Sequence, residues 1–337
     1  MGPVEALDRV VYLLDRALAE SQKVRAFMRA RDLAAEVGEA ELAQRHAAGT
    51  LTELPGIGPA TAGVIAEALD GGTPSYVAKL EEETVIPLGE GAELRTALKG
   101  DCHSHSTWSD GGASIETMAR TAQELGHEYL VLTDHSPRLT IAHGLTAERL
   151  RAQLEEIRAL NEKLAPFRIL TGIEVDILPD GELDQTDEML AALDVVVASV
   201  HSKLRMPRQE MTRRMVLALA NPNVDILGHC TGRKLVGGKR PPSEFDAEIV
   251  FAACARFDVA LEINCRPERQ DPPDELLAMA IDWGLSFSID TDAHAPGQLE
   301  WQNYGCDKAA RAGIPPERIV NTQSTMDLVA WAGSNPI

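Results

Sequence analysis

The stretch Val195-Val-Val-Ala-Ser-Val-His201 is an apolar run of strand length that ends on a histidine. The pattern recurs from residue 99 onward, where most apolar runs end on a histidine or acidic residue or lie beside one. The other segments of the series are His103-Ser-His105, Leu130-Val-Leu-Thr-Asp134-His135, Ile169-Leu-Thr-Gly-Ile-Glu174, Val224-Asp-Ile-Leu-Gly-His229 and Ser288-Ile-Asp-Thr-Asp292-Ala-His294. These segments predict strands with metal-ligand groups at their ends.

Seven candidate strands can be counted, and they end near residues 105, 135, 174, 201, 229, 265 and 292. Helical stretches such as Ala147–Leu164 and Glu210–Ala220 separate them. This alternation implies parallel strands with right-handed crossovers. Seven units within residues 98–337 fit a closed barrel of the TIM type better than an open sheet. The ligand candidates would then share the carboxyl ends of the strands, where such barrels keep their active sites.

Residues 1–97 predict a separate helical domain that contains Leu54-Pro-Gly56-Ile-Gly58-Pro-Ala60. A hydrophobic residue, Gly-x-Gly and then an apolar helix is the pattern of a helix-hairpin-helix turn. Gly56 and Gly58 permit a tight turn, and the following helix offers N–H groups to a DNA phosphate. A plain helix–helix connection fits equally well. Residues 1–100 carry 10 Lys+Arg and 16 Asp+Glu, a net charge of −6, which is poor for a dedicated DNA-binding module.

The composition limits the location and the partners of the chain. A net charge of −20 argues against general adhesion to nucleic acid or to an anionic membrane, and 4% aromatic residues make base stacking an unlikely main binding device. The five cysteines are odd in number and form no C-x-x-C, so we expect buried, reduced thiols and a cytoplasmic protein. Neither a signal peptide nor an apolar stretch of membrane length is present in the sequence.

Imidazole and carboxylate groups are ligands of divalent transition metals. His103 and His105 would share one face of a strand, and Glu174 could bridge two ions with its two oxygens. Such a cluster suits a phosphoryl group attacked by a metal-bridging hydroxide. The nine predicted ligands are His103, His105, Asp110, His135, Glu174, His201, His229, Asp292 and His294.

Other residues receive predicted roles around this cluster. We predict Glu174, His103 and Asp292 as the catalytic residues. Loop cations near the ligands are candidates for holding a substrate phosphate, with Arg233 preferred. The remaining candidates are Arg138, Arg269 and Lys203. His46 and His127 are predicted to lie at the surface, and His143 is left undecided between the site and the surface.

These motifs resemble the PHP (polymerase and histidinol phosphatase) superfamily, which matches at all nine ligand positions. Segments such as His103-Ser-His-Ser-Thr-Trp-Ser-Asp110-Gly and Gly172-Ile-Glu-Val-Asp-Ile-Leu-Pro-Asp180-Gly are similar to the PHP domain that ends bacterial family X DNA polymerases. Residues 47–58 are similar to the small helical domain that opens them. The polymerase palm and fingers are missing between the two parts, so nucleotide transfer is not expected. His143 and Cys230 stand where the family pattern has asparagine and proline.

The resemblance implies a distorted seven-stranded barrel, phosphoesterase activity and two to three divalent ions, with manganese, zinc or iron as candidates. It assigns ligands to three ions by position. The first ion takes His103, His105, Glu174 and Asp292, the second takes Glu174, His201 and His229, and the third takes Asp110, His135 and His294. In the related polymerases this domain is associated with 3′ to 5′ exonuclease activity and with cleaning of 3′ ends.

Three functions compete at this point. The first is a metal-dependent phosphoesterase acting on DNA 3′ ends, as an exonuclease or a 3′-phosphatase or phosphodiesterase, with a place in DNA repair. The second is a phosphatase for a small phosphomonoester such as histidinol phosphate or a nucleotide, which the negative charge favours. The third is a non-catalytic remnant that binds DNA ends, against which the full ligand set counts. Metal identity, substrate and oligomeric state stay open.

Overall fold

The computed structural model describes residues 1–334, which divide into two compact units. The first comprises Met1–Ile86 together with Pro296–Gln298, and the second comprises Pro87–Ala295 and the chain from Leu299 onward. The division follows Ile86 rather than residue 97, because α6 (Ala92–Ala97) packs on α13 (Gln302–Arg311) of the second unit.

The first unit is helical, and α1 packs against α2, α4 and α5. Leu7, Val10 and Leu14 recur at helical spacing on α1 and are buried against Phe27 and Ile65. This burial is the main reason that the short helices persist together. The elements are α1 (Pro3–Arg16), α2 (Ser21–Val37), α3 (Glu39–Ala48), the 3₁₀ turn η1 (Leu51–Glu53), α4 (Pro59–Leu69) and α5 (Ser75–Glu83).

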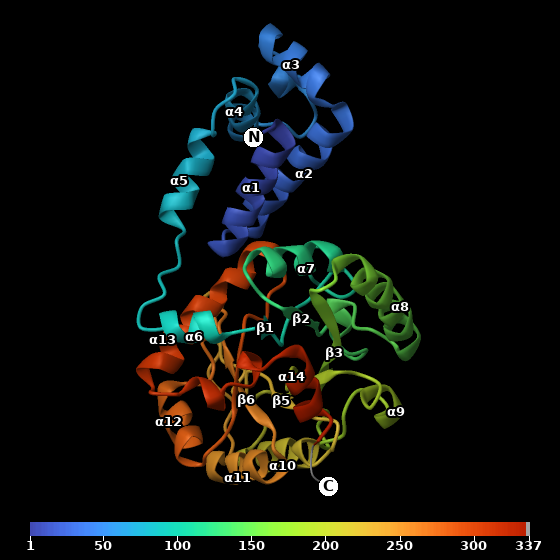
Figure 1. The fold of residues 1–337 in the computed structure, drawn as a ribbon, viewed down its shortest axis with the longest axis vertical. Helices are drawn as coiled ribbons and strands as arrows, with labels where there is room; N and C mark the ends of the chain where they lie inside the picture. The colour runs from blue at the N-terminus through green and yellow to red at the C-terminus, as the bar shows by residue number, and fades with distance from the viewer. Residues whose placement is uncertain (335–337) are drawn as a thin grey trace. The chain divides into compact units, whose positions relative to one another are not determined.

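The second unit is a barrel of seven parallel strands, and Figure 1 shows helices around the strands. Each strand pairs in parallel with the next in chain order from β1 to β7, which is the strand order of a (β/α) barrel. The predicted TIM-like α/β fold and the predicted number of strands are confirmed. The strands are β1 (Gly100–Asp101), β2 (Tyr129–Leu132), β3 (Arg168–Asp176), β4 (Val195–Ser199), β5 (Ile226–Leu227), β6 (Ala260–Asn264) and β7 (Phe287–Asp290).

The strands are almost entirely buried, as expected for a parallel sheet covered by helices. The predicted helix Ala147–Leu164 is α8, and its N-cap Thr146 accepts a hydrogen bond from the Arg149 N–H. No helix within residues 1–334 is both long and apolar enough to span a membrane. The other helices are α7 (Ile115–Glu124), α9 (Asp187–Leu190), α10 (Arg208–Leu219), α11 (Ala247–Phe257), α12 (Asp274–Asp282) and α14 (Thr325–Ala332), with 3₁₀ turns η2 (Thr140–Ala142), η3 (Pro296–Trp301), η4 (Pro316–Arg318) and η5 (Val320–Thr322).

The seam between β1 and β7 is joined by side chains in place of a strand ladder. A single parallel bridge, Ser104 with Ala293, connects the two chain segments beyond the strands. Within β1 and β7 themselves, the buried Asn321 donates to the carbonyls of Gly100 at 3.1 Å and Ile289 at 2.8 Å. The barrel is therefore closed at the end where the polar ligands follow β1 and β7.

Candidate metal centre

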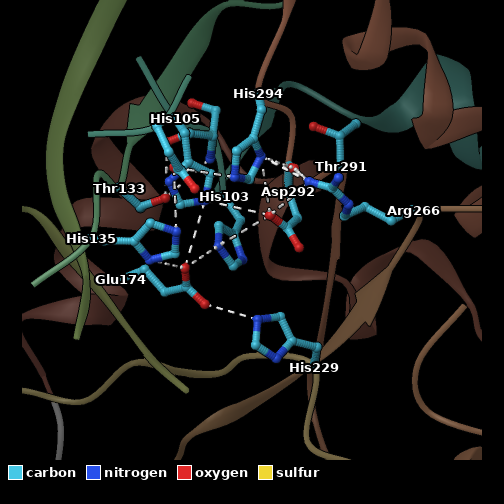
Figure 2. A network of polar contacts seen from close by, with 12 residues as sticks. His103, His105, Thr133, His135, Glu174, His229, Arg266, Thr291, Asp292 and His294 are labelled. Carbon is cyan, nitrogen blue, oxygen red and sulfur yellow. Dashed lines mark hydrogen bonds and ion pairs between the residues drawn. The ribbon is translucent and has the colours of Figure 1, made fainter. Parts of the chain in front are cut away.

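Eight of the nine predicted ligands follow one of the strands β1, β2, β4, β5 and β7, and the ninth, Glu174, lies within β3. The structure gathers all of them at the carboxyl ends of the strands. Figure 2 shows most of these side chains pointing toward Glu174. His103 and His105 are two residues apart in extended backbone and so point to the same side, with ring centroids 5.2 Å apart. The fold thus brings the predicted ligand residues together from distant parts of the sequence, as expected.

Glu174, on β3, is the centre of the cluster and is 1% exposed. Its Oε2 lies 2.9 Å from His135 Nδ1 and 3.3 Å from His103 Nε2. Its Oε1 lies 2.8 Å from His229 Nε2 and 3.1 Å from His201 Nε2. The two oxygens therefore face two different sets of histidines, which is the arrangement that a carboxylate bridging two ions needs.

Three groups of side chains offer ligand atoms within 4.8 Å of one another. They differ in part from the assignment implied by the family, because His105 and His135 each belong to two groups. Asp292 Oδ1 lies 3.4 Å from His105 Nε2 and 4.0 Å from His103 Nε2, at the edge of the group formed by His103, His105 and Glu174. The groups are His105, Asp110, His135 and His294; His103, His105 and Glu174; and His135, Glu174 and His201.

Charges within the cluster shift the pKa values strongly. Burial alone would raise the pKa of Glu174, but His201, His103 and His135 outweigh it and hold the carboxyl pKa well below its usual value. Burial, together with His294 and His135, keeps the pKa of His105 well below that of a free imidazole. A neutral imidazole beside an ionised carboxylate is the form of both groups that binds a metal.

Glu262, on β6, contacts two of the clustered histidines from the barrel interior and was not among the predicted residues. Its Oε1 lies 2.6 Å from His103 Nδ1, and its other oxygen accepts the backbone N–H of His229. Asn264 Nδ2 donates to Glu262 Oε2 and to Asp292 Oδ2, both at 3.2 Å. A carboxylate on a ligand histidine fixes its ring and tautomer. The signal in the sequence was a glutamate within the apolar run Ala260-Leu-Glu-Ile-Asn264.

Asp134 holds the loop that carries Asp110, and it too was missed as a site residue. It accepts hydrogen bonds from the Ser106 N–H at 2.8 Å, from Ser106 Oγ at 2.7 Å and from Gln153 Nε2 at 2.6 Å. Asp110 is then placed with Oδ1 3.3 Å from His294 Nε2 and 3.5 Å from His135 Nε2. The loop thus places Asp110 beside the clustered histidines.

A cavity of about 190 Å³ opens over the cluster. One part of its lining is apolar and formed by Leu139, Ile141 and Ala142, while Lys234, Arg266 and Arg269 supply positive charge. Ile141 is 88% exposed, which is unusual for an isoleucine at the mouth of a polar site. The cavity thus offers metal ligands, cations and an apolar surface to one small ligand.

Only one of the four predicted phosphate residues, Arg269, lines this cavity. Arg269 Nε lies 3.3 Å from Asp292 Oδ2. Arg233, the preferred candidate, instead donates to the carbonyls of Arg269 and Gln270. Arg138 lies 3.6 Å from Asp184 with a mostly exposed side chain, and Lys203 is exposed. Spacing along the chain placed Arg233 near His229 but could not show that nearby carbonyls hold its guanidinium.

Arg266, like Lys234, lines the cavity and was not among the predicted phosphate residues. Its Nη1 donates to the Asp292 carbonyl at 2.8 Å and approaches His294 Nδ1 at 2.8 Å, and its Nη2 donates to Glu268 at 3.0 Å. It is thus tied to two ligand residues. The sequence carried a weak signal for this role, since Arg266 follows β6 directly and the ligands follow the other strands.

The predicted helix-hairpin-helix turn precedes α4 of the first unit. Gly56 has a φ of +96°, a conformation that glycine adopts without strain. The N–H of Gly58 donates to Thr61 Oγ1 at 2.9 Å, so this donor already has an acceptor. A phosphate at this turn would therefore use the N–H groups of the first turn of α4, which lack intrahelical acceptors.

The remaining histidines divide between surface and core. His127 is only 5% exposed, so its predicted surface position is wrong. The polar neighbours Gly126 and Glu128 suggested exposure, yet His127 turns inward just before β2 while Glu128 stays outside. His143 is exposed with a φ of +55° and does not line the cavity. His46 is partly exposed beside Asp70, with Nε2 and Oδ1 3.0 Å apart. All five cysteines are buried and free, as expected.

The family model for the PHP domain matches residues 101–266. A DNA polymerase/3′-5′ exonuclease PolX from Bacillus subtilis (strain 168) is 42% identical over 238 residues, which are 71% of this chain but only 41% of that polymerase. The protein "Probable phosphatase YcdX" from Escherichia coli (strain K12) is 30% identical over 243 residues, with 68% of this chain and 89% of YcdX covered.

Solved structures also resemble the chain at low identity. Histidinol phosphate phosphatase from Lactococcus lactis, solved with zinc, L-histidinol and phosphate, has a TM-score of 0.46 and 18% sequence identity. The match covers 64% of this chain and 94% of that structure.

Proposed function

This chain belongs to the PHP family and is a metal-dependent phosphoesterase, and we propose from that premise that it hydrolyses phosphate esters at DNA 3′ ends. The observation that carries the proposal is the placement of Glu174, whose two oxygens face two sets of histidines beneath a cavity with two arginines. The nine clustered residues are proposed as the ligands of two to three ions of manganese, zinc or iron.

The residues present fit such ions. Glu174 Oε2, His103 Nε2 and both ring nitrogens of His105 are buried and make no hydrogen bond with the residues that the structure describes. Leaving buried polar atoms without partners is costly. Their ligand atoms nevertheless converge within a few ångströms. Mixed imidazole and carboxylate donors suit borderline transition ions, which would satisfy the unpaired atoms.

Divalent ions held here would lower the pKa of water toward neutrality and polarise the phosphoryl group. The protein supplies the frame for that chemistry. Glu174 and Asp292 bring negative charge to the centre, and Glu262 fixes the ring of His103. Arg266 and Arg269 place positive charge in the cavity lining, where a guanidinium can pair with two phosphate oxygens. His103, Glu174 and Asp292 are the residues proposed to act closest to the reacting phosphate.

DNA ends are favoured as substrate for two reasons. The chain is 42% identical to a polymerase/3′-5′ exonuclease over 71% of its own length. The helical unit also carries the Gly56 turn, which a small-molecule phosphatase would not need. The rival substrate class is a small phosphomonoester, and the size of the cavity together with the similarity to YcdX favours it. The complete ligand cluster counts against a non-catalytic remnant.

A matched substrate panel tests the proposal. The purified protein would be assayed with a 3′-phosphorylated oligonucleotide, a 3′-hydroxyl oligonucleotide, L-histidinol phosphate, a nucleoside monophosphate and a chromogenic phosphoester. Each assay would be run with manganese, zinc or iron, and with the Glu174→Gln variant as the control for contaminating phosphatases. We expect turnover of at least one DNA substrate and a fall of at least about a thousandfold in the variant, since bridging charge is removed.

The outcomes separate the candidate functions. Rapid hydrolysis of histidinol phosphate or the nucleotide, with no product from either oligonucleotide, would replace the DNA proposal by the small-molecule phosphatase. Equal rates for the parent and Glu174→Gln would place the chemistry outside this cluster.

A further inference from the structure

Two loops beside the metal cluster carry positive charge without any acid. Residues 231–243, after β5, contain Arg233, Lys234, Lys239 and Arg240 and no Asp or Glu. Residues 200–207, after β4, contain Lys203 and Arg205 and again no acid, whereas Arg208 at the start of α10 pairs with Asp246. In a chain of net charge −20, two acid-free basic loops beside the same cluster need an explanation.

The loop after β5 forms a hairpin with its own backbone hydrogen bonds. Lys234 and Arg240 exchange backbone hydrogen bonds of 2.9 and 3.0 Å, and Gly237 and Gly238, with φ of +67° and +97°, form its tip. The N–H of Leu235 donates to the Glu268 carbonyl at 2.7 Å, which attaches the hairpin to the loop after β6. The hairpin is thereby held beside the cavity, and Lys234 lines that cavity.

The two loops also contact each other. A Cβ on Gly232, which has a φ of +59°, would lie 3.0 Å from the side chain of Leu204. Gly232 begins the loop after β5 and Leu204 lies between Lys203 and Arg205. The two groups of cations therefore belong to one continuous edge of the barrel.

These charges are mostly not neutralised by carboxylates. Arg233 and Arg240 donate to backbone carbonyls, of Arg269 and Gly232 among others, and so keep their charge without an ion pair. Lys234, Lys239 and Arg205 have no carboxylate within salt-bridge distance among residues 1–334. A surface with several uncompensated cations on exposed loops is suited to a polyanion with regularly spaced charges.

We infer that these loops form a cationic rim that binds the phosphodiester backbone of a single-stranded nucleic acid while its terminal ester occupies the cavity. The rim consists of Lys203, Arg205, Arg233, Lys234, Lys239 and Arg240. A small phosphomonoester would be enclosed in about 190 Å³ and would not extend to exposed residues such as Lys239 and Arg205, whereas a strand leaving the cavity past Lys234 would. The inference rests on the proposed function, since it extends the same site along its substrate.

The test removes two exposed rim charges that lie outside the cavity. The double variant Arg205→Gln/Lys239→Gln is compared with the parent and with Arg168→Gln/Arg256→Gln, which removes the same charge from exposed residues at the start of β3 and in the last turn of α11. The probe is a fluorescent single-stranded phosphorothioate oligonucleotide, which resists hydrolysis, titrated over a series of salt concentrations. Hydrolysis of the chromogenic phosphoester is measured on the same preparations.

For the rim variant we expect roughly tenfold weaker binding at low salt and a salt slope smaller by about 1.4, because two phosphate contacts of about 0.7 each are lost. The control variant should match the parent, and all three proteins should hydrolyse the chromogenic ester equally. Unchanged affinity and slope in the rim variant, or no salt-dependent binding by the parent, overturns the inference. If the parent protein hydrolysed none of the phosphoesters, the proposed function would be overturned instead. The oligonucleotide affinity is measured without hydrolysis and therefore tests the rim separately.

Discussion

Glu262 is the residue through which the barrel core contacts the proposed metal ligands. Its carboxylate contacts His103 Nδ1 at 2.6 Å and accepts the N–H of His229, so it touches two ligand residues without facing the cavity. The pKa of His103 shows the same coupling: burial opposes protonation, but Glu174, Glu262 and Asp292 together raise it well above the usual value. We therefore propose Glu262 as a positioning residue.

We predict that Glu262→Gln weakens metal binding by about 10- to 100-fold, because the amide no longer holds the His103 ring through a charged hydrogen bond. Metal affinity would be measured by competition with a chromogenic chelator, and Glu128→Gln, an exposed acid before β2, is the matched control. If the effect passes through His103, adding Glu262→Gln to His103→Ala should cause little further loss. Full additivity in the double variant would contradict the positioning role.

His127 gives a pH dependence that is separate from the metal site. Burial and the nearby Arg95 lower its pKa to about 3, below the unfolded value of about 6.5. Between these values the unfolded chain binds more protons, so the stability due to neutral His127 is complete above pH 6.5 and is lost as the pH falls toward 3. The loss reaches about 2 kcal/mol at pH 5.

We predict that this pH-dependent loss disappears in His127→Leu. The free energy of unfolding would be measured by urea titration at pH 7.5 and pH 5 for both proteins. Since all other groups titrate alike in the two chains, the parent should lose about 2 kcal/mol more than the variant between the two pH values. Parallel losses would mean that His127 is not held neutral by its surroundings.

The sequence predicts residues well where the backbone decides their position. A histidine two residues past a parallel strand must lie at the carboxyl edge, so His103, His201 and His229 could be placed without coordinates. Side-chain direction within a loop is set by partners that are distant in sequence, such as the carbonyls that hold Arg233. This is why Arg233 was preferred and Arg266 overlooked, and why buried His127 looked like a surface residue.

At the scale of elements, the seam between β1 and β7 is where the barrel lacks the hydrogen bonds of a strand ladder. β1 has only two residues, too few for a ladder with β7, and the buried amides of Asn321 and Gln302 both donate to the Gly100 and Ile289 carbonyls. Asn321 Oδ1 also accepts the Ile289 N–H at 3.1 Å. Side-chain amides thus supply the hydrogen bonds that a neighbouring strand would otherwise make.

We predict that Asn321→Leu lowers the free energy of unfolding by about 3 kcal/mol, because it removes an amide that serves several buried backbone groups. Urea titration in the presence of chelator would measure this without a contribution from bound metal. Gln323→Leu, two residues away and partly exposed, should change stability by less than about 0.5 kcal/mol. Equal effects of the two substitutions would indicate that Gln302 alone maintains the seam.

The sequence predicts the seven strands because each is an apolar run bounded by helices, but it cannot predict this seam. Asn321 lies far along the chain in η5, after the last strand, and nothing in its neighbourhood marks it as a sheet partner. The family resemblance likewise implied a distorted barrel without indicating where the distortion lies. Such contacts arise from tertiary packing, which local patterns do not encode.

For the whole molecule, the two units have separate cores, and the proposed metal ligands all lie in the barrel. The helical unit is held by apolar contacts among α1, α2, α4 and α5. The barrel carries the nine proposed ligands, including six imidazoles in van der Waals proximity whose ring centroids lie 4.1 to 6.1 Å from their neighbours. A ligand that binds only the native barrel stabilises that unit alone.

We therefore predict two thermal transitions, of which only the one belonging to the barrel responds to metal. Metal at about one hundred times its dissociation constant adds about 2.7 kcal/mol, and for a unit of this size each kcal/mol moves Tm by about 2–4 °C, so chelation should lower the barrel transition by roughly 5–10 °C. Scanning calorimetry with and without chelator measures this, and elemental analysis of the same sample should give two to three ions per chain. Leu7→Ala, in the buried helical core, should move the other transition and leave the metal-dependent one in place. If Leu7→Ala and chelation shift one common transition, the two units unfold as one. If chelation of a metal-replete sample leaves the barrel transition unchanged, the cluster binds no structural ion.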